Sequence, residues 1–172
     1  MHETFMRRAI SLAERGRGHT APNPLVGAVL VRDGEIIGEG YHAVYGGLHA
    51  ERAALEDCLQ RGLSPTGAAL YVTLEPCCHT GKQPPCTEAI LAAGIRAVFV
   101  GSSDPNPLVA GKGIAALRQG GIAVTEHVSE SACDALNAPF FHHIRTGLPF
   151  VVLKYAMTLD GKTAVKVGTD FL

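Results

Sequence analysis

The sequence predicts a three-layer α/β fold, in which a central mixed, largely parallel sheet carries helices on both faces. Apolar runs of strand length alternate with segments of helical periodicity over residues 69–145, and alternating strands and helices form parallel sheets that are covered on both faces. Two earlier β-rich runs are joined by Asp33-Gly34, a dipeptide typical of antiparallel hairpins. The length of 172 residues and the hydrophobic content of 47% suit a well-buried core.

The amino-terminal elements follow from short patterns. Apolar residues at helical spacing predict a first helix over residues 3–15, which Gly16 ends. Strands are predicted over residues 26–31 and 35–40, on either side of the hairpin turn, and they should pair antiparallel.

The next elements carry the residues of greatest chemical interest. A second helix is predicted over residues 49–62, a strand over residues 69–74 and a third helix over residues 85–94. His49 and Cys86 therefore fall at helix amino termini, while Cys77 follows the carboxyl end of a strand. The positive end of a helix dipole favours thiolate groups, so the predicted placement suits a site with charged sulfur atoms.

The remaining chain continues the alternation. Buried strands are predicted over residues 97–101 and 122–126, helices over residues 112–119 and 129–145, and a further apolar strand over residues 150–156. Residues 147–149 form the candidate linker, which divides the chain into a first domain over residues 1–147 and a terminal segment over residues 148–172. An open sheet of this type binds ligands beyond the carboxyl ends of its strands, where Cys77 is expected.

Charge and cysteine content limit the classes of partner. The formal net charge is −1, so no basic footprint favours nucleic acid or an anionic membrane. No apolar run approaches the roughly 18 residues that a membrane-spanning helix needs. The five cysteines are odd in number and lack the spacing of a secreted domain. We therefore expect a cytoplasmic protein that acts on a small molecule.

Three residues of metal-ligand type and one carboxylate occur in the order that a hydrolytic metal site needs. His49, Cys77 and Cys86 are the expected ligands of a Zn²⁺ ion; a catalytic zinc keeps its fourth position for water, whose pKa it lowers to roughly 7. Glu51 follows His49 by two residues and is the expected proton carrier. Zinc deaminases share the pattern H-x-E followed by P-C-x-x-C, although eight residues separate Cys77 from Cys86 here.

Several segments together resemble one family. They are PNPLVG at residues 22–27, GYH at 40–42, HAE at 49–51, TLEPCCH at 73–79, GKQPPC at 81–86, DPNP at 104–107 and GKG at 111–113. In these segments the chain resembles the deaminase domain of the bifunctional riboflavin-biosynthesis deaminase/reductase, of the cytidine-deaminase-like superfamily. The long loop between Cys77 and Cys86 is similar to that of the family, whereas Cys78 and Gln83 stand where the family typically has serine and threonine.

The resemblance implies a substrate, a reaction and a set of binding residues. The substrate is 2,5-diamino-6-ribosylamino-4(3H)-pyrimidinone 5′-phosphate, whose ring 2-amino group is replaced by oxygen with release of ammonia. The residues that match the family's substrate-binding positions are Asn23, His42, Lys82, Asp104 and Asn106. Amides and a carboxylate suit the polar edges of a pyrimidine and a ribose, and Lys82 or His42 suits the phosphate.

The resemblance also bears on the terminal segment. The family's partner domain is a reductase that uses NADPH, and residues 150–162 resemble its beginning. Because little chain follows, we expect neither NADPH binding nor reductase activity. If residues 150–156 form a strand without a partner, its exposed edge favours a homodimer.

Two alternatives stay open at this point. The chain could be a deaminase of the same superfamily that acts on guanine, cytosine or a tRNA adenosine, although the net charge disfavours tRNA. It could instead be a structural zinc module, closed by a fourth ligand from Cys78 or His79. Glu51 has no purpose in such a module.

Overall fold

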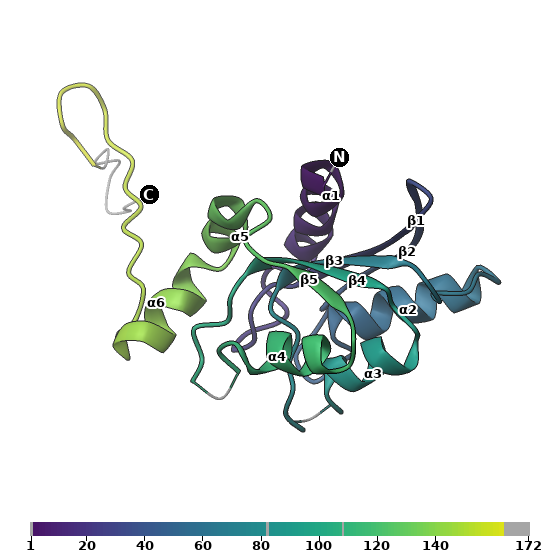
Figure 1. Cartoon of the computed structure of the whole chain (residues 1–172). Helices are drawn as coiled ribbons and strands as arrows, with labels where there is room; N and C mark the ends of the chain where they lie inside the picture. The colour runs from purple at the N-terminus through teal and green to yellow at the C-terminus, as the bar shows by residue number, and fades with distance from the viewer. Residues whose placement is uncertain (1, 82, 108, 164–172) are drawn as a thin grey trace.

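A computed structural model describes residues 2–81, 83–107 and 109–163 of the chain (Figure 1). Within these residues one sheet has the strand order β2-β1-β3-β4-β5. The strands are β1 (Gly27–Arg32), β2 (Glu35–Tyr41), β3 (Ala69–Leu74), β4 (Ala97–Ser102) and β5 (Ala123–Thr125). β1 pairs antiparallel with β2 and β3, whereas β4 pairs parallel with β3 and β5. The predicted mixed sheet is confirmed, but it is not largely parallel as expected, because two of its strand pairs are parallel and two are antiparallel.

Helices cover both faces of this sheet, as predicted. They are α1 (His2–Glu14), α2 (Ala50–Gln60), α3 (Cys86–Ala92), α4 (Lys112–Gln119), α5 (Glu130–Leu136) and α6 (Ala138–Thr146). Figure 1 shows α1 and α5 above the sheet and α2, α3 and α4 below it. The lower core joins residues of those three helices, such as Ala54 and Leu117, to Leu70 of β3, and the upper core joins Met6 of α1 to Tyr71.

The alternation of side chains along β3 explains this division. Successive residues of a strand point to opposite faces, so Leu70 enters the lower core and Tyr71 the upper core. All six residues of β3 are buried. A strand that is covered on both faces is apolar throughout, and this is why residues 69–74 lack a polar alternation.

The hairpin between β1 and β2 forms as predicted. Asp33 has φ 53° and Gly34 has φ 83°, the positive values that both central residues of a type I′ turn require. The turn places β2 at the edge of the sheet, where α2 packs against it. A Cβ atom on Gly40 would lie 2.3 Å from the backbone nitrogen of Ala54, so this glycine allows the close approach that sets the position of α2.

The predicted single helix over residues 129–145 is wrong, because the chain breaks at Asn137 into α5 and α6. The side chain of Asn137 accepts a hydrogen bond from the backbone N–H of Leu25 and donates one to its carbonyl oxygen, both at 2.8 Å. Pro139 lies in the first turn of α6, where a missing N–H is tolerated, whereas inside a continuous helix its ring would clash. The break brings α6 to the site described below.

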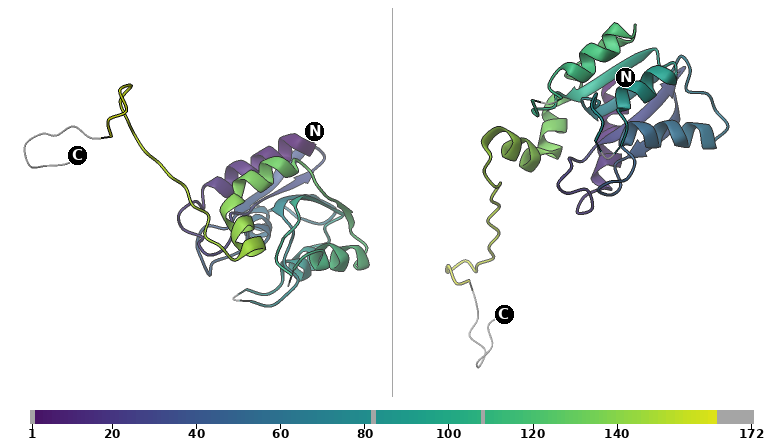
Figure 2. Two further views of the ribbon diagram at one scale, coloured as in Figure 1. Left: turned by 90° about the vertical axis from the view of Figure 1, so that its left-hand side faces the viewer. Right: turned by 90° about the horizontal axis from the view of Figure 1, so that it is seen from below.

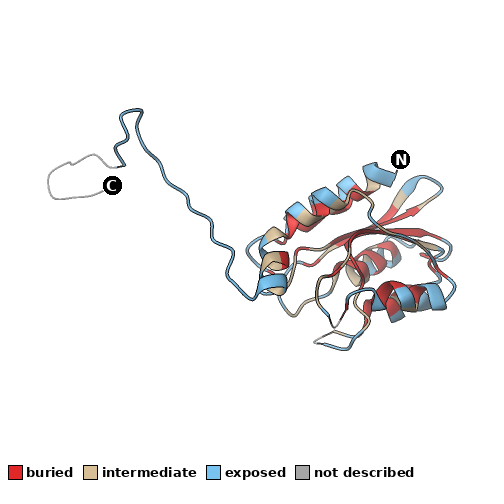
Figure 3. Ribbon diagram, turned by 60° about the vertical axis from the view of Figure 1, so that its left-hand side comes forward, coloured by how far each residue is buried: buried red, intermediate tan, exposed pale blue. Residues whose placement is uncertain are grey.

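The predicted strand over residues 150–156 is also wrong. The described chain beyond residue 148 has no strand or helix, and it runs as an extended, exposed segment away from the body (Figures 2 and 3). Val151 is 81% exposed. A strand needs a neighbour to pair with, and among the described residues no strand pairs with this segment. The homodimer inference therefore loses the strand edge that motivated it.

The predicted strand over residues 122–126 is shorter and less buried than expected. β5 spans three residues at the edge of the sheet, and two of them are exposed. Among the described residues, no helix combines the length and the apolar character that crossing a bilayer requires.

Candidate active site

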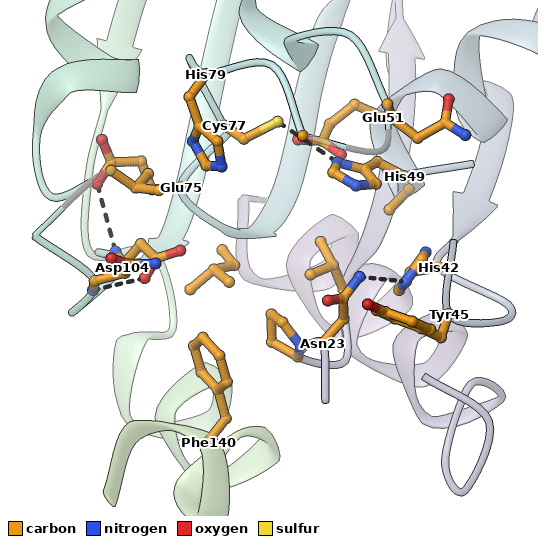
Figure 4. Close-up of a pocket in the computed structure, with 18 of the residues that line it drawn as sticks. Asn23, His42, Tyr45, His49, Glu51, Glu75, Cys77, His79, Asp104 and Phe140 are labelled. Atoms are coloured by element: carbon orange, nitrogen blue, oxygen red, sulfur yellow. Dashed lines mark hydrogen bonds between the residues drawn. The ribbon is translucent and has the colours of Figure 1, made fainter. Parts of the chain in front are cut away.

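A cavity of about 270 Å³ opens beside the carboxyl ends of β3 and β4 (Figure 4). Its wall includes the start of α2, the segments that follow β2, β3 and β4, and Phe140 of α6. This place agrees with the expectation that ligands bind beyond the carboxyl ends of strands. The volume lies just below the range for small-molecule sites, which begins at roughly 300 Å³.

His49, Cys77 and Cys86 come together in one group, of which His49 and Cys77 line the cavity. The Nδ1 atom of His49 lies 3.5 Å from the Sγ atom of Cys77 and 3.4 Å from the Sγ atom of Cys86. With ordinary zinc bond lengths, a tetrahedral ion would separate a nitrogen ligand from a sulfur ligand by about 3.6 Å. One nitrogen and two sulfur donors at this spacing therefore fit zinc.

Among the residues that the structure describes, these three form the one group able to hold a metal ion. Neither Cys78 nor His79 belongs to it. A structural zinc normally has four protein ligands, so a group of three is the donor set of an open site.

Local structure positions each donor. His49 is the N-cap residue of α2, and Cys86 is the first residue of α3. The backbone N–H of Cys86 donates to the Sγ atom of Cys77 at 3.4 Å, and that of Thr87 donates to the carbonyl oxygen of Cys77 at 3.2 Å. The start of α3 thus holds the loop that carries Cys77.

These contacts separate the two thiols electrostatically. Hydrogen bonds from Cys86 and His49 lower the pKa of Cys77 to about 4. The hydrogen bond with Cys77 and burial raise the pKa of Cys86. Metal binding needs both sulfur atoms as thiolates, so it must remove the proton that burial favours on Cys86.

Glu51 lies in the first turn of α2 and is 3% exposed. Burial raises the pKa of this carboxyl group to about 7, and the charge of Cys77 adds to the effect. A carboxyl group that titrates near neutral pH can both accept and donate a proton. Its side chain lines the same cavity as His49 and Cys77.

His42 and Asn23 form a pair beside His49 (Figure 4), and the ring centroids of the two histidines are 5.5 Å apart. The Nδ1 atom of His42 lies 2.8 Å from the carbonyl oxygen of Leu48, to which it must donate, because a carbonyl only accepts. Burial lowers the pKa of His42, so its Nε2 atom accepts from the Nδ2 atom of Asn23 at 3.1 Å. Both ring nitrogens thus have protein partners.

Asp104 and Asn106 follow β4 and line the cavity. Asp104 is 9% exposed, and burial raises its pKa. Its Oδ1 atom accepts the backbone N–H of Asn106 at 2.8 Å. Four of the five predicted substrate residues, Asn23, His42, Asp104 and Asn106, therefore share one cavity.

Lys82 lies outside the described residues. Its neighbour Gln83 lines the cavity and donates from Nε2 to the carbonyl oxygen of Gly46 at 3.1 Å. The glutamine thereby joins the long loop between the two cysteines to the segment that follows β2.

The cavity is also lined by residues for which the sequence predicted no role. They are Tyr45, Glu75 and Phe140 among others. Glu75 belongs to the segment at residues 73–79 that carries Cys77, so its position in the sequence was a usable signal. Phe140 had no such signal, because only the packing of α6 brings it to the site.

The comparisons with known proteins agree with this geometry. Residues 1–102 match the family described as the cytidine and deoxycytidylate deaminase zinc-binding region. The riboflavin biosynthesis protein RibD of Actinobacillus pleuropneumoniae is 56% identical over 164 residues, which are 95% of this chain and 43% of that protein. The chain thus spans less than half the length of this curated relative.

Two solved structures resemble the chain. One is the diaminohydroxyphosphoribosylaminopyrimidine deaminase/5-amino-6-(5-phosphoribosylamino)uracil reductase of Thermotoga maritima, with a TM-score of 0.91 and 52% identity over 95% of this chain and 46% of that one. The other is the dCMP deaminase of cyanophage S-TIM5 in apo form, with a TM-score of 0.59 and 26% identity over 73% of this chain and 95% of that one.

Proposed function

Because the chain belongs to the cytidine and deoxycytidylate deaminase zinc-binding family, we propose that it deaminates 2,5-diamino-6-ribosylamino-4(3H)-pyrimidinone 5′-phosphate in riboflavin biosynthesis. The observation that carries the chemistry is the donor group of His49, Cys77 and Cys86 with Glu51 buried beside it. The substrate is supported by the names of the RibD proteins and of the Thermotoga maritima enzyme.

The reaction exchanges an amino group for oxygen. His49, Cys77 and Cys86 would hold the zinc ion, which would lower the pKa of a water molecule at the site. Glu51 would accept one proton as the water oxygen bonds to ring carbon 2, and would deliver it to the ring nitrogen. It would then take the proton of the new hydroxyl group and pass it to the amino group, so that the bond between carbon 2 and the amino nitrogen breaks and ammonia and a ring carbonyl remain.

The walls of the cavity orient the pyrimidine. His42 holds the Nδ2 atom of Asn23, so the amide oxygen points away from the histidine (Figure 4) and is placed to accept an N–H of the substrate. Asp104 and Asn106 lie on another wall and suit the ribose hydroxyls. His42, held at both nitrogens, is a poor partner for a phosphate, which we assign to the loop of His79 and Lys82.

Ammonia release tests this function. Zinc-loaded protein is incubated with the pyrimidinone ribosyl phosphate, and cytidine and guanine serve as controls. We expect release from the ribosyl phosphate alone. Ammonia release from cytidine or guanine instead would indicate that the site acts on another base. No release from any of the three compounds, by protein that holds one zinc per chain, would contradict the proposal.

Three further proposals concern the whole chain. We propose that residues 1–147 form the deaminase domain and that residues 148–172 begin a further unit, since α6 ends at Thr146 and the described residues after it are exposed.

We also propose a homodimer, supported by the exposed apolar side chains of Val151, Leu153 and Tyr155. Light scattering at micromolar concentration should give the mass of a dimer; the mass of a monomer would contradict it. A cytoplasmic location stays a prediction.

A further inference from the structure

Glu75 is buried at the end of β3, with 4% of its surface exposed, and its carboxyl group accepts hydrogen bonds from four backbone N–H groups in other segments of the described chain. Its Oε2 atom accepts the N–H groups of Asp104 at 3.4 Å and Gly111 at 3.0 Å. Its Oε1 atom accepts those of Gly113 at 3.0 Å and Ile114 at 3.3 Å. Each oxygen of a carboxylate can accept two hydrogen bonds and donates none, so this carboxyl group can serve all four N–H groups.

Three of these four N–H groups, those of Gly111, Gly113 and Ile114, belong to the start of α4. The first N–H groups of a helix have no partner within the helix, and the N-cap residue here is Gly111, which has no side chain to supply one. Glu75 supplies the acceptors from a different element. A Cβ atom on Gly113 would lie 2.0 Å from the carbonyl oxygen of Pro76, so α4 begins directly against the segment that leads to Cys77.

The same carboxyl group connects the two sides of the cavity. Pro76 and Cys77 follow Glu75 on the side of the metal donors, while Asp104 and Asn106 lie on the side assigned to the ribose. The backbone N–H of Glu75 donates to the carbonyl oxygen of Ser102 at 2.9 Å, so the ends of β3 and β4 are tied at this residue. Between these two sides of the cavity, the Glu75 side chain adds a direct hydrogen bond to Asp104.

We infer that Glu75 is a positioning residue, which holds Asp104 at the distance from the metal donors that the substrate requires. The inference rests on the proposed function, because Asp104 contacts the substrate only there. Glu75→Gln keeps the size of the side chain but replaces one acceptor oxygen with an N–H₂ group. That group would face the N–H donors of Asp104 or of α4, and the segment of Asp104 would shift.

Steady-state kinetics of the zinc-loaded Glu75→Gln variant test the inference. We expect KM for the pyrimidinone ribosyl phosphate to rise about tenfold, which corresponds to the loss of one hydrogen bond to a charged group, while kcat changes less than about threefold. Zinc content should stay at one per chain. Ser102→Ala is the matched control, because it removes a partly buried hydrogen bond to Asp134 at the end of β4 and should leave KM unchanged.

A double variant separates positioning from general damage. If Glu75 acts through Asp104, adding Glu75→Gln to Asp104→Asn should raise KM by less than about threefold, because coupled residues are not additive. Two independent tenfold effects would overturn the inference. So would a fall in kcat at unchanged KM, which is the pattern of partial misfolding.

Hydrogen exchange gives a readout without catalysis. In Glu75→Gln the amides of Asp104, Gly111, Gly113 and Ile114 should exchange faster than in the wild type; unchanged protection of these amides would show that Glu75 does not hold them and would overturn the inference. If the wild type releases no ammonia, the proposed function fails and exchange still decides the role of Glu75 in holding α4 and Asp104. If Glu75→Gln does not fold, the same measurements are made on Glu75→Asp, which keeps the carboxylate on a shorter side chain.

Discussion

The Nε2 atom of His42 accepts a hydrogen bond from the Nδ2 atom of Asn23 across 3.1 Å, and this contact sets which end of the amide faces the cavity. His42 is 2% exposed and donates its other ring N–H to the carbonyl oxygen of Leu48. The histidine therefore fixes the orientation of the Asn23 amide, with the amide nitrogen toward His42 and the amide oxygen away from it. The prediction that His42 itself touches the substrate stays a prediction.

Replacing His42 should misorient Asn23 without releasing the metal. In His42→Phe the amide loses its acceptor, and we expect kcat/KM to fall about tenfold or more, as for a lost buried hydrogen bond. Metal analysis should still give one zinc per chain. His19→Gln is the control, because His19 is exposed and lies outside the cavity; equal losses in both variants would contradict the role of His42.

The adjacent cysteines should differ in their effect on metal content. Cys77→Ser removes a donor of the three-residue group, whereas Cys78→Ser removes a thiol outside it. We expect the first variant to lose zinc during dialysis against a weak chelator and the second to keep one zinc per chain. Loss of zinc from Cys78→Ser would indicate a closed structural site and would restore that alternative.

Gly40 should tolerate no side chain, because its Cβ atom would lie 2.3 Å from the backbone of α2. We expect Gly40→Ala to lower the free energy of unfolding by roughly 2 kcal/mol or more, as overpacking does. Because His49 is the N-cap residue of α2, the shift should also weaken zinc binding. Gly62→Ala is the control: its φ of 71° carries strain but its Cβ meets open space, so urea unfolding should show a smaller loss, with zinc retained.

The Arg8–Glu39 ion pair should give an acid-sensitive contribution to stability. Arg8 binds both carboxylate oxygens of Glu39, at 2.6 and 2.7 Å, and this hydrogen bonding lowers the pKa of Glu39. Because the pKa of Glu39 is lower in the folded protein than in the unfolded chain, the ion pair contributes its full stability at pH values above the unfolded pKa of about 4.3. The contribution disappears as the pH falls through the lower pKa of the folded protein.

Thermal melting of Arg8→Gln checks this sign. The pair is partly exposed, so we expect the variant to melt about 1–3 °C below the wild type at pH 7. The difference should shrink as the pH drops below about 4. A difference that is constant with pH would show that the arginine acts by packing. Arg17→Gln is the matched control, because it breaks the exposed ion pair with Glu14, the last residue of α1.

Local sequence signals predicted much of this structure, and the failures have a common physical cause. Asp33-Gly34 predicted the hairpin because its two positive φ values are a property of those residues. The break at Asn137 depends on hydrogen bonds to Leu25, which is far away in the sequence. Residues 150–156 have a strand pattern, but pairing needs a neighbour that no local pattern supplies.

The candidate site shows the same division. The spacing of His49, Cys77 and Cys86 predicted the donor group, because each residue type is itself the chemical requirement. The role of Glu75 was missed, although it is two residues from Cys77, because its four donors come from segments after β4. Patterns predict donors and elements, while contacts between distant segments appear only in the fold.

The most direct test of the central claim is ammonia release by Glu51→Gln together with its zinc content. The amide keeps the shape of the buried side chain but cannot take up the proton. We predict one zinc per chain and a rate at least about a hundredfold below the wild type, the smallest contribution usual for an acid–base group. A variant that keeps its zinc and still releases ammonia at the wild-type rate would contradict the assignment of Glu51 as the proton carrier.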